Sequence, residues 1–185
     1  MKSLRLIFII CFAAITSAGY AQVVGKTFPD LEGETVNNKK ITLPKDTNDK
    51  YTLVGLAYSK KSEGDLNTWY SPVYNKFVYK SEKPSLFSSF QYDVNVFFVP
   101  MFTGVNAAAK GVAKKKALKK VDPKLFPHIL FYKGKLKPYK QALDFEKKDI
   151  PYFFVLDKAG KIIYATSGRF TDKKLGEIES VLEED

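Results

Sequence analysis

The chain has 185 residues, a formal net charge of +10 at pH 7 and one cysteine, Cys11. This length fits a single domain that buries a substantial apolar core, and one cysteine excludes an intrachain disulfide. The positive excess is almost entirely lysine, which suits anionic lipid headgroups, cell-surface polymers or an acidic protein partner, and equally a solvated surface without any partner.

The N-terminus has the pattern of a secretory signal peptide. A basic start is followed by an apolar stretch over residues 6–15, which is shorter than the about 20 residues that a membrane-spanning helix needs. The small residues Gly19 and Ala21 then stand at the usual cleavage spacing. We therefore predict a signal peptide over residues 1–21 and one domain over residues 22–185, exported to the periplasm or secreted, without a transmembrane segment in the mature chain.

Cleavage after Ala21 would also remove Lys2, Arg5 and Cys11, leaving a net charge of +8 and no cysteine. Nucleic acid is not expected as a partner of an exported protein, so we expect an unknown protein of the cell envelope or an anionic surface. No cofactor is expected either. No metal site is expected, because the single histidine, His128, has no second histidine or cysteine to complete one.

The first third of the mature chain predicts a hairpin and a central strand. Residues 28–43 should form a short hairpin that turns at Asn37-Asn38. The continuous apolar run over residues 51–58 is typical of a strand covered on both faces. A helix with Ser62 as its N-cap should follow, with a kink or restart at Ser71-Pro72.

The remainder predicts further strands and helices in alternation. Residues 92–102 should form a second buried strand, residues 105–121 a lysine-rich helix, and residues 128–132 a third strand that ends in a Lys133-Gly134 turn. The final segments should form an antiparallel hairpin, over residues 152–156 and 161–165, and a closing helix with Thr171 as its N-cap.

This order of elements resembles the thioredoxin-like superfamily over nearly all of the mature chain. Residues 28–33 (FPDLEG) resemble the first segment of redoxins of the peroxiredoxin and exported thiol-disulfide types. Residues 150–161 (IPYFFVLDKAGK) resemble their cis-proline strand and hairpin. The resemblance implies an α/β thioredoxin-like fold, with a central mixed β-sheet flanked by helices and an N-terminal β-hairpin. It also implies that the Ile150–Pro151 bond is cis and borders a groove for an extended peptide.

A looser resemblance is to the thioredoxin-like assembly factors of mitochondrial ATP synthase. It rests on residues 53–57 (LVGLA), on Trp69 and on residues 99–102 (VPMF). Members of that family are thought to act on a partner protein during assembly, so this resemblance implies a protein-binding role.

Comparison with the redoxin pattern also shows that the catalytic cysteines are missing. In those families the catalytic Cys-x-x-Cys, or a single peroxidatic cysteine, lies where the first central strand meets the helix, because a helix N-terminus lowers the thiol pKa. Here that junction, residues 58–64, reads YSKKSEG and contains no thiol. A serine hydroxyl cannot cycle through a disulfide, so no catalytic residue is assigned.

The candidate binding residues are therefore the clustered lysines and the residues that border the groove beside Pro151. Lysines at a predicted helix N-terminus are unfavourable unless they hold an anion or an acidic partner. The six lysines of residues 110–120 include like-charge pairs four residues apart, which also oppose the helix. For both lysine clusters, the alternative to a binding role is that the side chains are simply solvated. For Pro151, the alternative is that it only shapes its strand. The candidates are Tyr58, Lys60 and Lys61 at the junction, Ile150 and Pro151 at the groove, and Lys114, Lys115 and Lys119 on the helix.

Two functions fit these features. The first is a non-catalytic protein-binding or assembly module of the cell envelope, because the fold is kept without reactive thiols. The alternative is a redoxin-related oxidoreductase or antioxidant protein that acts through the thiols of a partner.

Overall fold

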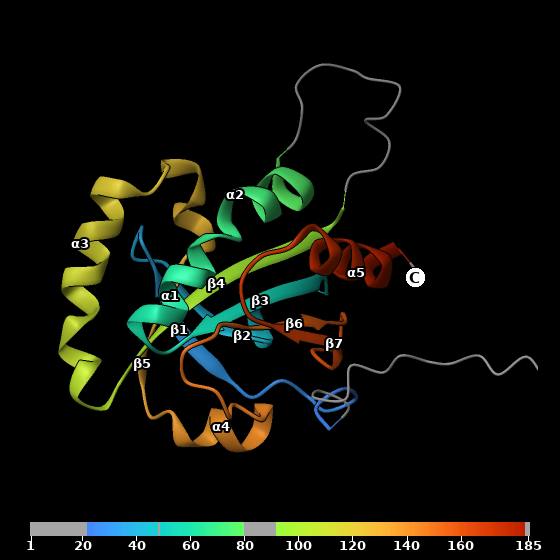
Figure 1. The fold of residues 1–185 in the computed structure, drawn as a ribbon, viewed down its shortest axis with the longest axis horizontal. Coiled ribbons are helices and arrows are strands. Elements are labelled where there is room, and N and C mark those ends of the chain that lie inside the picture. The colour runs from blue at the N-terminus through green and yellow to red at the C-terminus, as the bar shows by residue number, and fades with distance from the viewer. Residues whose placement is uncertain (1–21, 48, 80–91, 184–185) are drawn as a thin grey trace, which may run out of the picture.

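The computed structural model describes residues 22–47, 49–79 and 92–183, so the predicted signal peptide lies outside the described residues. Seven strands form one mixed sheet in the spatial order β2-β1-β5-β4-β3-β6-β7 (Figure 1). The strands are β1 (Leu31–Thr35), β2 (Lys40–Leu43), β3 (Tyr51–Ala57), β4 (Val94–Thr103), β5 (Leu130–Gly134), β6 (Tyr152–Leu156) and β7 (Ile162–Ser167).

Five α-helices and several short helical turns connect the strands within these residues. The helices are α1 (Lys60–Asn67), α2 (Tyr70–Val73), α3 (Lys110–Lys120), α4 (Lys137–Leu143) and α5 (Asp172–Glu183). The turns are 3₁₀ segments η1 (Lys45–Thr47), η3 (Gly104–Ala109) and η4 (Pro123–His128), and a π-helical segment η2 (Tyr74–Val78). No helix of the described ranges is long and apolar enough to cross a membrane.

The centre of the sheet consists of parallel pairs and its borders of antiparallel ones. Strand β4 runs parallel to both β3 and β5, whereas β6 is antiparallel to β3 and to β7. The N-terminal hairpin of β1 and β2 joins the sheet by an antiparallel pairing of β1 with β5. This mixed sheet with an N-terminal hairpin confirms the predicted fold class.

Helices cover both faces of the sheet, as the long apolar runs of β3, β4 and β6 require. Alternate residues of one strand point to opposite faces, so Val54 and Leu56 pack with α4, while Leu53 packs with Trp69 and α5. Figure 1 accordingly shows α4 on one side of the sheet and α2 and α5 on the other. A smaller apolar cluster lies under α3, where Ala117 packs with side chains of β4 and β5.

The strands and the closing helix follow the prediction closely, and four details differ. Helix α1 is capped by Ser59 and not by Ser62, which lies at its third position. The predicted helix over residues 105–121 is α-helical only in α3, and the segment before it is the 3₁₀ turn η3. Lys133 and Gly134 belong to β5, and the helix α4 that follows was not predicted. Its seven residues contain only Tyr139 and Leu143 as buried positions, which is too short an apolar pattern to recognise.

Candidate functional site

The junction of β3 and α1, where the redoxin families place their thiols, is closed by two serines. Ser59 Oγ accepts a hydrogen bond from the Ser62 backbone N–H at 3.1 Å, and Ser62 Oγ accepts one from the Ser59 N–H at 2.9 Å. The two hydroxyl oxygens are 3.1 Å apart. This reciprocal capping box satisfies backbone donors at the start of α1. Ser59 and Ser62 have the spacing of a Cys-x-x-Cys pair. The sequence analysis did not predict a role for this spacing.

Ser59 also joins the junction to the segment before β6. Its hydroxyl donates a hydrogen bond to Asp149 Oδ1 at 2.9 Å, which brings Ile150 and Pro151 to the same end of the sheet. Pro151 is buried, and its carbonyl accepts a hydrogen bond from the Gly168 N–H at 2.8 Å. The structure thus brings together the predicted junction and proline residues.

The predicted cis geometry of Ile150–Pro151 is wrong. In the described residues the cis peptide bond is Leu43–Pro44, and the Ile150–Pro151 bond is trans. An X–Pro bond favours trans by roughly 0.5–1 kcal/mol, so local packing must favour cis for that isomer to form, and the family pattern alone does not ensure such packing. A binding role for Ile150 and Pro151 stays a prediction.

Tyr58 is held beside this junction by aromatic packing. Its ring stacks on Phe145 with the centroids 5.6 Å apart, and Lys140 Nζ lies 5.6 Å from the ring centroid. The ring is 5% exposed, and its hydroxyl has no hydrogen-bond partner among the described residues. Burial, reinforced by the nearby Asp149 carboxylate, raises the pKa of Tyr58. The phenol therefore stays neutral and does not act as a base at neutral pH.

Within the described residues, no histidine lies at the junction to act as the base for a serine nucleophile. The Ser59 hydroxyl donates a hydrogen bond to the Asp149 carboxylate and accepts one from the Ser62 backbone N–H. A serine nucleophile is usually activated by a positioned base such as histidine. His128 is engaged elsewhere: its Nδ1 lies 3.0 Å from the Val96 carbonyl oxygen and its ring meets Tyr74 edge-on. Burial lowers the pKa of His128. In the part of the chain that the structure describes, the two serines therefore hold the junction together.

The predicted lysines have different environments. Lys60 and Lys61 are exposed in the first turn of α1, and Lys115 and Lys119 are exposed on α3. Lys114 instead forms an ion pair with Glu34 on β1 at 2.6 Å and also contacts Asn38. Lys114 therefore anchors α3 to the hairpin, a role that the sequence reading missed because Glu34 lies 80 residues away.

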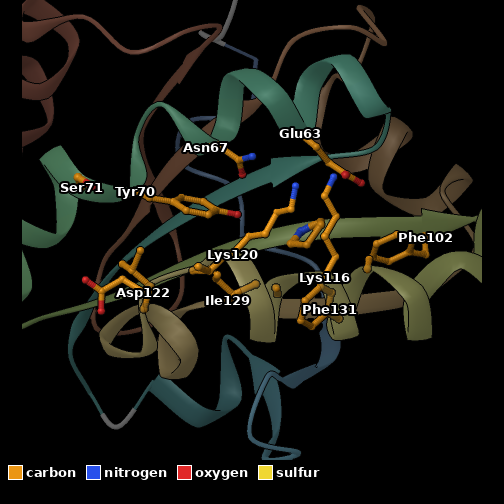
Figure 2. Close-up of a pocket in the computed structure, with 15 residues that line it drawn as sticks. Glu63, Asn67, Tyr70, Ser71, Phe102, Lys116, Lys120, Asp122, Ile129 and Phe131 are labelled. Carbon is orange, nitrogen blue, oxygen red and sulfur yellow. The ribbon is translucent and has the colours of Figure 1, made fainter.

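A pocket of about 530 Å³ lies between α1, α2 and α3 (Figure 2). Its apolar lining comes from β4, β5, the inner face of α3 and the segment from η4 to β5, with Pro100, Phe102, Ala117, Leu125, Ile129 and Phe131 among its residues. Figure 2 shows Glu63 and Asn67 reaching into this space from α1, Lys116 and Lys120 reaching into it from α3, and Tyr70 entering from the side.

Several polar groups of the pocket lack direct partners among the described residues, whereas Asp122, which also lines it, forms an ion pair with Lys124 at 3.3 Å. Within the described ranges, the side chains of Glu63, Asn67, Lys116 and Lys120 form no ion pair and no hydrogen bond, and neither does the Tyr70 hydroxyl. Burial raises the pKa of Glu63, and the charge of Lys116 partly opposes that rise. Burial likewise raises the pKa of Tyr70 well above its usual range, with a contribution from Glu63. The pocket thus combines an apolar floor with free donors and acceptors.

Residues 18–184 match the ATP10 protein family. The chain belongs to this family. The match covers nearly the whole chain and agrees with the looser of the two sequence resemblances, the one to assembly factors. A search of curated proteins found no significant match.

The fold of this ATP10 family member is similar to solved thioredoxin-like structures. The thioredoxin domain of a thiol-disulfide oxidoreductase from Bacteroides vulgatus matches with a TM-score of 0.58 and 17% identity, over 86% of this chain and 98% of that one. A 2-Cys peroxiredoxin from Plasmodium vivax matches with a TM-score of 0.54 and 16% identity, over 88% and 98%. BsSco, of the Sco family of cytochrome c oxidase assembly proteins, matches with a TM-score of 0.55 and 10% identity, over 85% and 94%. At these identities the matches confirm the thioredoxin-like fold alone.

Proposed function

We propose that this ATP10 family member is an exported assembly module that binds a protein partner of the cell envelope without thiol chemistry. The observation that carries the proposal is the Ser59–Ser62 capping box. At the place where redoxins keep reactive thiols, both hydroxyls bond backbone N–H groups of the same helix. The fold is thereby retained without the group that would make it an oxidoreductase.

Two further observations support binding as the function. The family suggests an assembly role, which requires contact with a partner protein. The pocket between α1 and α3 offers an apolar floor and several polar groups without a direct partner among the described residues, as binding sites commonly do. Export is supported by the signal-peptide pattern of residues 1–21.

The absence of catalysis is tested by insulin reduction with dithiothreitol, using the protein purified after export. We expect the parent to be inactive. The matched control is the double variant Ser59→Cys/Ser62→Cys, which places two thiols at a helix N-terminus that lowers thiol pKa values. Activity of this variant would show that the assay detects a redox site on this scaffold. Reduction of insulin by the parent itself would contradict the proposal.

Partner binding is tested by photo-crosslinking in cells, with a benzophenone amino acid at Asn67 in the pocket or at Lys173 on the exposed side of α5. We expect a specific protein adduct from position 67, absent from position 173. Alkylation of cellular thiols with N-ethylmaleimide before irradiation separates the two function classes. An adduct that survives alkylation fits the assembly module, whereas its loss would favour the alternative of a redoxin that acts through partner thiols.

A further inference from the structure

Helix α3 divides its six lysines among three directions. Lys110 and Lys114 pair with the Glu34 carboxylate. The other four lysines are exposed: Lys116 and Lys120 line the pocket, whereas Lys115 and Lys119 do not. Positions four residues apart share one face of a helix, so each pair acts from a different side. The pocket-facing lysines can therefore be tested separately from the general positive charge of the helix.

The pocket-facing lysines share the pocket with buried apolar side chains. Phe102, Ile129 and Phe131 are at most 5% exposed and belong to the apolar cluster under α3. Lys116 and Lys120 are exposed, so their ammonium groups are accessible to an anion that enters the pocket from solvent. The arrangement therefore suits a ligand that carries an apolar group and a carboxylate close together.

The remaining polar groups favour a peptide over a fatty acid. A fatty acid needs only cations and an apolar floor, but the pocket also contains the carboxylate of Glu63, the amide of Asn67 and the hydroxyl of Tyr70. Together these supply acceptors for backbone N–H groups and donors for backbone carbonyls. A volume of about 530 Å³ lies within the usual range for ligand pockets and leaves room for a short segment.

We propose that this pocket recognises a short segment of a partner protein in which a large apolar side chain is followed by an acidic residue. The apolar side chain lies on the floor of β4 and β5, and the carboxylate pairs with Lys116 and Lys120. The inference rests on the proposed function, since it names the chemistry of the partner that the assembly module binds.

The test is an NMR titration of the ¹⁵N-labelled protein, expressed with its own signal peptide and purified. The probe is the blocked peptide acetyl-Gly-Phe-Glu-Gly-amide, compared with its glutamine counterpart. We expect amide shifts confined to α1, α2, α3 and the adjoining ends of β4 and β5. Replacing glutamate by glutamine in the peptide should weaken binding by about fivefold to tenfold, because a charge-assisted contact is lost.

The matched variants are two double substitutions on the same helix. Lys116→Gln/Lys120→Gln should weaken binding of the glutamate peptide by the same factor, whereas Lys115→Gln/Lys119→Gln, with an equal change in net charge, should not. Lys116→Arg/Lys120→Arg should retain binding, and the amide spectrum of each variant checks its fold. Equal losses from both glutamine variants, or shifts spread over the whole surface, would overturn the proposal. Binding of decanoate at the pocket without binding of the peptide would overturn it as well.

The outcome can be separated from that of the proposed function. If the position-67 crosslink persists in the Lys116→Gln/Lys120→Gln variant and the peptide does not bind the parent protein, the assembly module stands but the pocket chemistry is wrong. If no thiol-independent crosslink forms and the peptide still binds the pocket, the pocket chemistry stands and the assembly role fails.

Discussion

The ammonium group of Lys114 lies 2.6 Å from the carboxylate of Glu34, so the lysine-rich helix is tied to the first strand of the sheet. Lys110 reaches the other oxygen of the same carboxylate at 2.8 Å. Hydrogen bonds from these two lysines, opposed by partial burial, lower the pKa of Glu34 from 4.5 to about 2. One half-buried carboxylate thus neutralises two of the closely spaced lysines that would otherwise oppose helix formation.

This pairing predicts an acid dependence of stability. A carboxylate whose pKa is lowered in the folded state stabilises the protein above its unfolded pKa, and the contribution disappears as pH falls from about 4.5 toward 2. Glu34→Gln should therefore lower the free energy of unfolding by about 1–2 kcal/mol at pH 7, and by progressively less below pH of about 4. Urea unfolding across this range measures the effect. Glu32→Gln is the control, because the exposed Glu32 has only a 3.9 Å pairing with Lys40, and an equal loss there would contradict the assignment.

The different environments of the helix lysines predict different effects of neutralising them. Lys114→Gln should destabilise the protein by about 1 kcal/mol, because it breaks an ion pair in a half-buried position. Lys115→Gln and Lys119→Gln should leave thermal stability unchanged, since both side chains are exposed. Thermal unfolding of the three single variants gives the comparison. A stable Lys114→Gln variant would mean that the contact with Glu34 contributes nothing measurable.

The capping box predicts a coupled loss of stability. Ser59→Ala or Ser62→Ala should each cost about 1 kcal/mol, because each removes a side-chain acceptor at the start of α1. Since the two serines bond each other's backbone, the double variant should lose less than the sum of the single losses. Urea unfolding of this mutant cycle tests the coupling. Ser71→Ala, at an exposed serine of α2, is the control, and strictly additive losses would argue against a cooperative cap.

The signal-peptide pattern predicts processing after Ala21. Intact-mass measurement of the protein recovered after export should find a chain that begins at Gln22. Gly19→Leu/Ala21→Leu should block cleavage and leave the full-length precursor with the membranes, because small residues are needed at the cleavage site. Leu6→Val, within the apolar stretch, should be processed normally. A mature chain that retained Cys11 would contradict the predicted boundary.

The sequence by itself determined the strands, the hairpins and the lack of a cysteine pair. Apolar runs such as residues 152–156 indicate buried strands because both faces of a central strand must be covered, and Thr171 was correctly expected at the start of the last helix. The single cysteine excludes a dithiol site whatever the fold. These features are local or compositional, so they can be read without knowing which segments meet.

Only the tertiary structure decided which groups work together. The pairing of Glu34 with Lys114, the contact between Ser59 and Asp149, and the pocket shared by α1 and α3 all join segments far apart in the chain. Lys114 and Lys116 look alike in sequence, yet they point to different sides of one helix and meet different partners. Their roles depend on which strands and helices pack against each side, and that packing is set by the order of the strands in the sheet.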